Sequence, residues 1–262
     1  MNAKDLHPLA AGMLIGATGE GGSGKSHFLR TAADYVLAKG RKVFVAVAPP
    51  EEAASYAGLD LDYEPIEDTE WRPSANMFAA NGLGRFWAYC DRIEKVENVG
   101  LIGLDTASEL QFSVSRAILG PQRKSNPRDT VDPFAFYTAF RYRMGEVIDR
   151  LRILRRLHNA HLIINFHTTT RESETLTGSR DQVLPDMQGG LRDVLSRYFD
   201  LFFYASAEES GGSVKRRLIA APTRRIPAKV RFPGLEAKLL AIKEGIPNDF
   251  AALVRVLNGE AK

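Results

Sequence analysis

Residues 19–26 read Gly19-Glu20-Gly21-Gly22-Ser23-Gly24-Lys25-Ser26. This order matches the pattern G-x-x-x-x-G-K-[ST] in full. Glycines let backbone N–H groups turn inward around phosphate oxygens, and a helix that begins here adds its positive N-terminal end. The motif therefore predicts a phosphate-binding loop between a strand and a helix.

The sequence on both sides of the motif has the pattern that such a loop requires. Residues 13–17 form a short apolar run, typical of a buried strand, and residues 26–39 place their apolar side chains on one helical face. Continuous apolar runs predict further buried strands at residues 43–48, 99–104 and 161–166, and helical periodicity predicts helices at residues 83–96 and 134–157. The alternation predicts an α/β fold with a mostly parallel central sheet flanked by helices.

The rest of the chain is less regular. We expect antiparallel strands at residues 201–205 and 215–221, at the C-terminal edge of the sheet, and two short helices near residues 235–242 and 250–257. Residues 51–80 are acidic and are interpreted as an irregular surface excursion, and residues 120–132 and 168–190 as two long loops. We therefore expect one domain over residues 1–262, with a core at about residues 10–234 and C-terminal helices at 235–262.

A phosphate-binding loop of this type holds a nucleotide and a magnesium ion with a small set of residues. Lys25 would supply a cation for the β and γ phosphates, and the Ser26 hydroxyl would bind Mg²⁺. Asp105 ends the apolar strand at residues 99–104 and is the expected second magnesium ligand. The sequence thus predicts ATP and Mg²⁺ as cofactors, held by Gly19, Glu20, Gly21, Gly22, Ser23, Gly24, Lys25, Ser26 and His27.

The carboxylate that would activate water is less clear, because Thr106 and not a glutamate follows Asp105. Glu51 and Glu52 stand just past the second strand, and we take Glu51 as the first candidate, with Glu20 and Glu109 as alternatives. His167 ends the strand at residues 161–166, at the same edge of the sheet. It could contact the γ phosphate or could pack as a core histidine.

Composition excludes several classes of protein. The chain has 262 residues, 44% of them hydrophobic and 26% charged, and a single cysteine, so it has no disulfide framework of its own. No apolar run reaches the length of about 20 residues that crosses a bilayer, and a cytoplasmic location is expected. Residues 1–110 carry 10 basic and 16 acidic side chains, whereas residues 111–262 carry 25 basic and 16 acidic side chains. The basic second half is consistent with a polyanionic partner or with solvated helix faces.

Taken together, these residues resemble RecA-like P-loop ATPases and are similar to the phage RecA-like single-strand annealing ATPases, also described as phage nucleotide-binding AAA proteins. The resemblance runs from about residue 14 to residue 234. Four features carry it in order: the phosphate-binding loop, the pair Asp105-Thr106, the strand that ends at His167, and the stretch Ala228-Lys229-Val230-Arg231-Phe232-Pro233-Gly234.

The resemblance implies an oligomeric ATPase, a ring or a filament, that binds single-stranded DNA during recombination or annealing and is phage or prophage encoded. Lys229 and Arg231 would reach the ATP of a neighbouring subunit, and a single-stranded-DNA-binding protein is a possible further partner. The two loops at residues 120–132 and 168–190 would hold DNA through Arg123, Lys124, Arg128, Arg171 and Arg180.

Two other functions stay open. A small-molecule or nucleoside kinase shares the phosphate-binding loop but needs an acceptor pocket and a closing lid, for which residues 168–190 are available. A nucleotide-gated DNA-binding scaffold would bind ATP with little turnover. Phosphoryl transfer to an acceptor other than water, or DNA binding without phosphate release, would distinguish them.

Overall fold

The computed structural model of the protein describes residues 12–72, 77–120, 130, 132–175, 178–223, 228–231, 236–242 and 244–260. Its centre is a sheet with the strand order β13-β11-β10-β1-β7-β6-β2-β3, and β12 pairs with β10. The first group of strands is parallel: β1 (Leu14–Thr18), β2 (Lys42–Val47), β3 (Asp62–Pro65), β6 (Val99–Asp105), β7 (His161–Phe166) and β10 (Leu201–Ser210). The antiparallel group is β11 (Ser213–Ile219), β12 (Lys229–Val230) and β13 (Ile246–Pro247).

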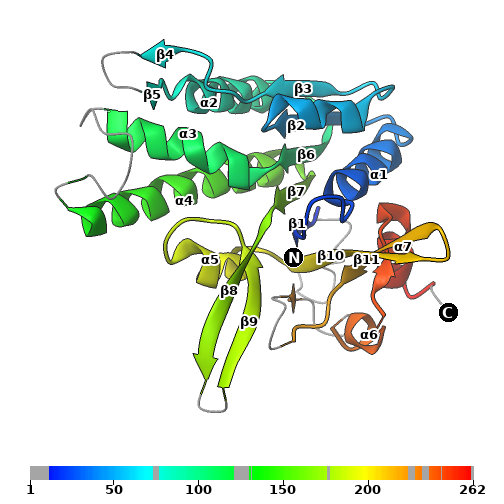
Figure 1. Cartoon of the computed structure of the whole chain (residues 1–262). Coiled ribbons are helices and arrows are strands. Elements are labelled where there is room, and N and C mark those ends of the chain that lie inside the picture. Colours follow the sequence, from blue (N-terminus) through cyan, green and yellow to red (C-terminus); the bar gives the residue numbers. More distant parts are fainter. Residues whose placement is uncertain are drawn as a thin grey trace, which may run out of the picture.

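Helices cover both faces of this sheet, as Figure 1 shows. One face packs against α2 (Asn81–Glu94), α3 (Ala107–Leu119) and α4 (Pro133–His158), and the other against α1 (Lys25–Leu37), α6 (Glu236–Ala241) and α7 (Phe250–Asn258). The side chains of β1, β6 and β7 are buried along their full lengths. Strands covered on both sides need such continuous apolar runs, which explains why the sequence pattern located them.

The predicted α/β fold is confirmed, including the antiparallel strands at one edge. The predicted strands and helices flanking the phosphate-binding loop start and end within a few residues of their observed bounds. In the described part of the chain, no helix is both long and apolar enough to cross a membrane.

Two predictions about loops were wrong. Residues 51–80 are not an irregular excursion, because they contain the 3₁₀ helix η2 (Pro50–Tyr56), the edge strand β3 and the short pair β4 (Trp71–Arg72) and β5 (Met77–Phe78). Residues 168–190 are not a long loop, because β8 (Thr168–Thr175) and β9 (Gly178–Pro185) form an antiparallel hairpin. An edge strand and a two-stranded ribbon meet solvent on several sides, so neither carries the apolar run that marks a buried strand.

This hairpin extends away from the sheet and its helices (Figure 1). Two short helices, α5 (Leu191–Val194) and η6 (Leu195–Tyr198), follow it and lead into β10. The carboxyl ends of β1, β2, β6 and β7 meet at one edge of the sheet, where Thr18 lies in register with Phe166 and Val47 with Asp105. Ligands of open α/β sheets bind outside this edge, and the predicted residues Lys25, Asp105 and His167 lie there.

Candidate nucleotide site

The phosphate-binding loop leads into α1 with the geometry that the motif predicts. Gly24 has a left-handed backbone, with φ of 95°, and a Cβ atom there would lie 2.5 Å from Nδ2 of Asn248. Only glycine fits this conformation and this contact. Among the described residues no side chain caps the N-terminus of α1, so the N–H groups of its first turn are available to an anion.

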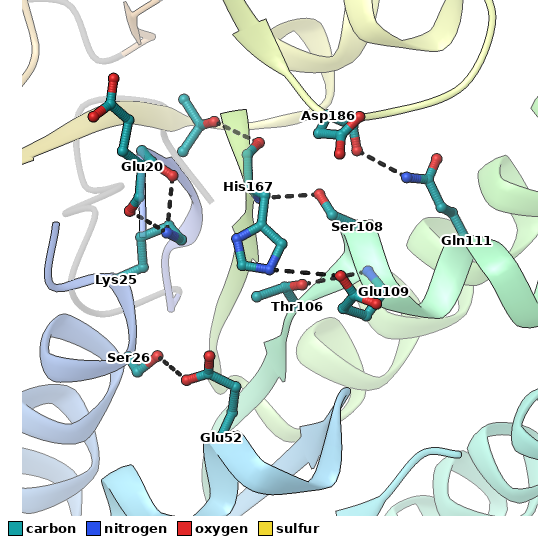
Figure 2. A network of polar contacts seen from close by, with 12 residues as sticks. Glu20, Lys25, Ser26, Glu52, Thr106, Ser108, Glu109, Gln111, His167 and Asp186 are labelled. Atoms are coloured by element: carbon teal, nitrogen blue, oxygen red, sulfur yellow. Dashed lines mark hydrogen bonds and ion pairs between the residues drawn. The ribbon is translucent and has the colours of Figure 1, made fainter. Parts of the chain in front are cut away.

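Lys25 lies across the loop. Its Nζ atom donates hydrogen bonds to the carbonyl oxygens of Gly19 at 2.8 Å and of Glu20 at 2.9 Å (Figure 2). Burial lowers the pKa of Lys25, and the nearby carboxylates of Asp105, Glu52 and Glu20 act in the opposite direction. The ammonium group is therefore held over the loop by weak carbonyl partners that phosphate oxygens can replace.

The acidic side chain beside Ser26 is Glu52. The Ser26 hydroxyl donates to Oε2 of Glu52 at 3.1 Å (Figure 2). Glu51, which the sequence analysis took as the first candidate, is exposed and lines a neighbouring pocket with Glu109. The two side chains diverge because η2 is a 3₁₀ helix, in which successive residues point about 120° apart.

Asp105 is fully buried at the end of β6. Its Oδ2 atom accepts a hydrogen bond from the Tyr56 hydroxyl at 2.6 Å, and its Oδ1 atom accepts one from Nδ2 of Asn165 at 2.9 Å. A hydroxyl and a carboxylate are hard oxygen donors, and Mg²⁺ takes one or two carboxylates together with substrate phosphates and water. Ser26 and Asp105 therefore fit a magnesium ion chemically.

His167 connects three parts of the site. Its backbone N–H donates to Oγ of Ser108 at 3.0 Å, and its carbonyl oxygen accepts from the Thr18 hydroxyl at 3.2 Å. Its Nε2 atom lies 3.8 Å from Oε1 of Glu109, and its side chain is only partly buried. The residue thus lies between β1, which leads into the phosphate-binding loop, and α3, which follows Asp105 (Figure 2).

A row of buried polar side chains on α3 continues this network to the base of the hairpin. Gln111 donates from Nε2 to the carbonyl oxygen of Asp186 at 3.0 Å and accepts from the backbone N–H of Gln188 at 2.9 Å. The Ser115 hydroxyl donates to Oε1 of Gln188 at 3.2 Å. The N–H of Asp186 in turn donates to the carbonyl oxygen of His167 at 2.8 Å. Hydrogen bonds therefore join His167 and α3 to the base of the hairpin.

Two residues that the sequence analysis missed hold the outer side of the loop. Asn248 donates from Nδ2 to the carbonyl oxygens of Gly24 at 2.9 Å and Ser23 at 3.3 Å. Arg216 donates from Nε to the carbonyl oxygen of Gly22 at 3.3 Å. Both come from the C-terminal part of the chain, more than 190 residues away, and no local motif marks them.

Lys229 and Arg231 lie at the end of the sheet where β1 and β10 begin, opposite the end that carries the phosphate-binding loop. Lys229 pairs with Phe202 near the start of β10, whose first residue is in register with Ile15 of β1. The Arg231 guanidinium bonds to the carbonyl oxygen of Arg197 and is exposed. Burial lowers the pKa of Lys229, and Arg231 and Arg197 add to the effect. Within this chain the pair therefore lies away from the phosphate-binding loop.

The other predicted residues divide between the described and the undescribed parts of the chain. Arg123, Lys124 and Arg128 lie outside the described residues. Arg171 is an exposed residue of β8, and Arg180 belongs to β9, in register with Ser173. His27 is exposed in the first turn of α1, next to Ser26.

A family model described as an AAA domain matches residues 11–232. The match includes the phosphate-binding loop, Asp105, His167 and the hairpin, and leaves out α6, β13 and α7. No curated protein matches the chain.

Proposed function

The chain belongs to the AAA domain family of P-loop ATPases, and from this premise we propose that it is a magnesium-dependent ATPase that binds single-stranded DNA. The observation that carries the proposal is the convergence of Lys25, Ser26, Glu52 and Asp105 at one edge of the sheet. These four side chains are the groups that phosphate binding, metal binding and water activation require. His167 lies at the same edge, and its carbonyl oxygen accepts a hydrogen bond from Asp186 at the base of a projecting hairpin.

Each residue has a distinct part in ATP hydrolysis. The N–H groups of the loop and of the first turn of α1 bind the phosphates, and Lys25 neutralises charge on their β and γ oxygens. A magnesium ion held by Ser26 and Asp105 would neutralise further charge. Glu52 orients the attacking water and accepts its proton at a carboxylate oxygen. His167 lies where a change at the γ phosphate can alter its contacts with α3 and the hairpin.

The DNA part of the proposal concerns the hairpin of β8 and β9. It projects from the body of the protein and carries the exposed Arg171, and its base bonds to α3 and to His167. Basic side chains that contact phosphates bind single strands without sequence preference. From the resemblance to phage annealing ATPases we extend the proposal to recombination or annealing by a phage or prophage protein, alongside a single-stranded-DNA-binding protein.

We also propose that the working form is a homo-oligomer. Lys229 and Arg231 lie too far from the phosphate-binding loop of their own subunit to serve it, so a role at ATP requires a neighbouring copy. An arginine supplied in this way stabilises charge on the transferred phosphoryl group. The proposed oligomer is a ring or a filament with ATP between subunits.

A kinase is the second candidate, because a pocket of about 420 Å³ opens beside the site. Its walls are the residues after β2 and β3 and one face of α3, and include Glu51, Asp68, Glu109, Phe112 and Arg116. An acceptor held there would lie next to Glu109, which contacts His167.

One experiment distinguishes these functions: phosphate release from ATP with and without single-stranded DNA, for the wild type and Lys25→Ala. The proposal predicts turnover that DNA stimulates and that Lys25→Ala abolishes. Turnover indifferent to DNA would contradict DNA coupling and direct the search to an acceptor in the pocket. ATP-dependent DNA binding without phosphate release would indicate a nucleotide-gated scaffold.

A further inference from the structure

The 3₁₀ helix η2 contacts both residues assigned to the metal. Near its start, Glu52 accepts a hydrogen bond from Ser26 at 3.1 Å, and at its end the Tyr56 hydroxyl donates to Asp105 at 2.6 Å. Glu52 already has a part in the proposed chemistry. Tyr56 is buried, with 4% of its surface exposed, and neither the family match nor the proposed function gives it one.

Tyr56 is held firmly in this position. Its ring belongs to the buried cluster between the sheet and α1, and Arg30 on α1 donates to the carbonyl oxygens of Ser55 at 2.7 Å and Ala57 at 3.0 Å. The hydroxyl is therefore fixed beside the Asp105 carboxylate, to which it donates at 2.6 Å.

The two donors on Asp105 determine where its remaining acceptor capacity points. Tyr56 occupies one lone pair of Oδ2 and Asn165 one lone pair of Oδ1, and an ionised carboxylate offers about four such sites. Each oxygen keeps capacity for a metal ion or a metal-bound water. Such outer partners fix the orientation of a ligand, and their loss commonly weakens metal affinity 10–100-fold.

We propose that Tyr56 is a positioning residue, which orients the Asp105 carboxylate toward a divalent cation through its buried hydrogen bond. The inference rests on the proposed function, because it assumes that Asp105 serves a magnesium ion bound with ATP. It adds to that function a determinant of metal affinity that does not itself touch the metal or the nucleotide.

The test is a magnesium titration of the binding of a fluorescent ATP analogue to the full chain. Tyr56→Phe removes only the hydroxyl. Tyr89→Phe is the matched control, because Tyr89 is equally buried but donates to the backbone carbonyl of Asp62 at 3.0 Å, away from the site. We expect the magnesium midpoint to rise about tenfold in Tyr56→Phe and to stay at the wild-type value in Tyr89→Phe. Analogue affinity in the presence of a chelator should be the same in all three proteins.

A second variant guards against a purely structural effect. Asn165→Leu removes the donor on the other oxygen of Asp105, and we expect the magnesium midpoint to rise in the same direction. A midpoint in Tyr56→Phe that equals the wild-type value, or lies below it, would overturn the inference. A wild type whose nucleotide binding ignores magnesium would instead overturn the proposed function, so the two failures are distinguishable.

Discussion

Replacing Glu52 by glutamine tests the assignment of the water-activating carboxylate. Oε2 of Glu52 lies 3.1 Å from the Ser26 hydroxyl, and glutamine can keep that hydrogen bond while losing the ability to accept a proton. General-base catalysis contributes about 10²–10⁴-fold to rate, or roughly 3–5 kcal/mol of activation free energy at 1.36 kcal/mol per factor of ten. We therefore expect kcat for ATP to fall at least about 100-fold, with the affinity for ATP nearly unchanged.

Glu51→Gln is the matched control for this prediction. Glu51 is the preceding residue of the same 3₁₀ helix, but it is exposed and faces the neighbouring pocket, so its replacement should change kcat by no more than about twofold. Phosphate release under saturating ATP and Mg²⁺ compares both variants with the wild type. A large loss in Glu51→Gln together with nearly normal turnover in Glu52→Gln would instead assign water activation to Glu51.

Three further predictions concern residues outside the immediate chemistry. Asn248→Ala removes the side-chain donor from the carbonyl oxygens of Ser23 and Gly24, although the Gly24 oxygen still accepts from the Phe28 N–H. The free energy of unfolding should fall by about 1–3 kcal/mol, measured by urea denaturation, and an unchanged urea midpoint would contradict a stabilising role for Asn248. Burial, and to a smaller extent the positive charge of Arg41, lowers the pKa of His161 from 6.5 to about 4. Between these two pH values the folded state therefore binds fewer protons than the unfolded chain. The free energy of unfolding should fall as the pH drops, by about 2 kcal/mol between pH 7.5 and pH 5. In urea denaturation at these two pH values, His161→Gln should show a smaller difference than the wild type. Arg231→Ala should lower turnover at least about tenfold, since an arginine finger contributes more than this, while ATP binding persists; wild-type turnover would rule out the intersubunit role.

The features that the sequence predicted are those with a local cause. The phosphate-binding loop, the buried strands on both sides of it and Asp105 at a strand end each depend on residues within a short window. A parallel sheet covered on both faces needs continuous apolar runs, and these runs are visible in the sequence. The position of His167 at the same sheet edge follows from the same rule.

The features that the sequence missed depend on contacts between distant residues. Tyr56 meets Asp105 over a separation of 49 residues, and Asn248 meets Gly24 over 224. Glu51 and Glu52 are neighbours, and which of them faces Ser26 depends on how η2 is held against α1 by Arg30. The hairpin was predicted as a loop because neither of its strands carries a continuous apolar run, although its repeated threonines are typical of strands.

The ATPase assignment is tested most directly by phosphate release from ATP as a function of magnesium concentration, in the wild type and in Lys25→Ala. We expect saturable, magnesium-dependent release by the wild type and none above background by Lys25→Ala. Release that does not require magnesium, or that survives the loss of Lys25, would contradict the claim that this loop and its metal ligands form an ATPase site.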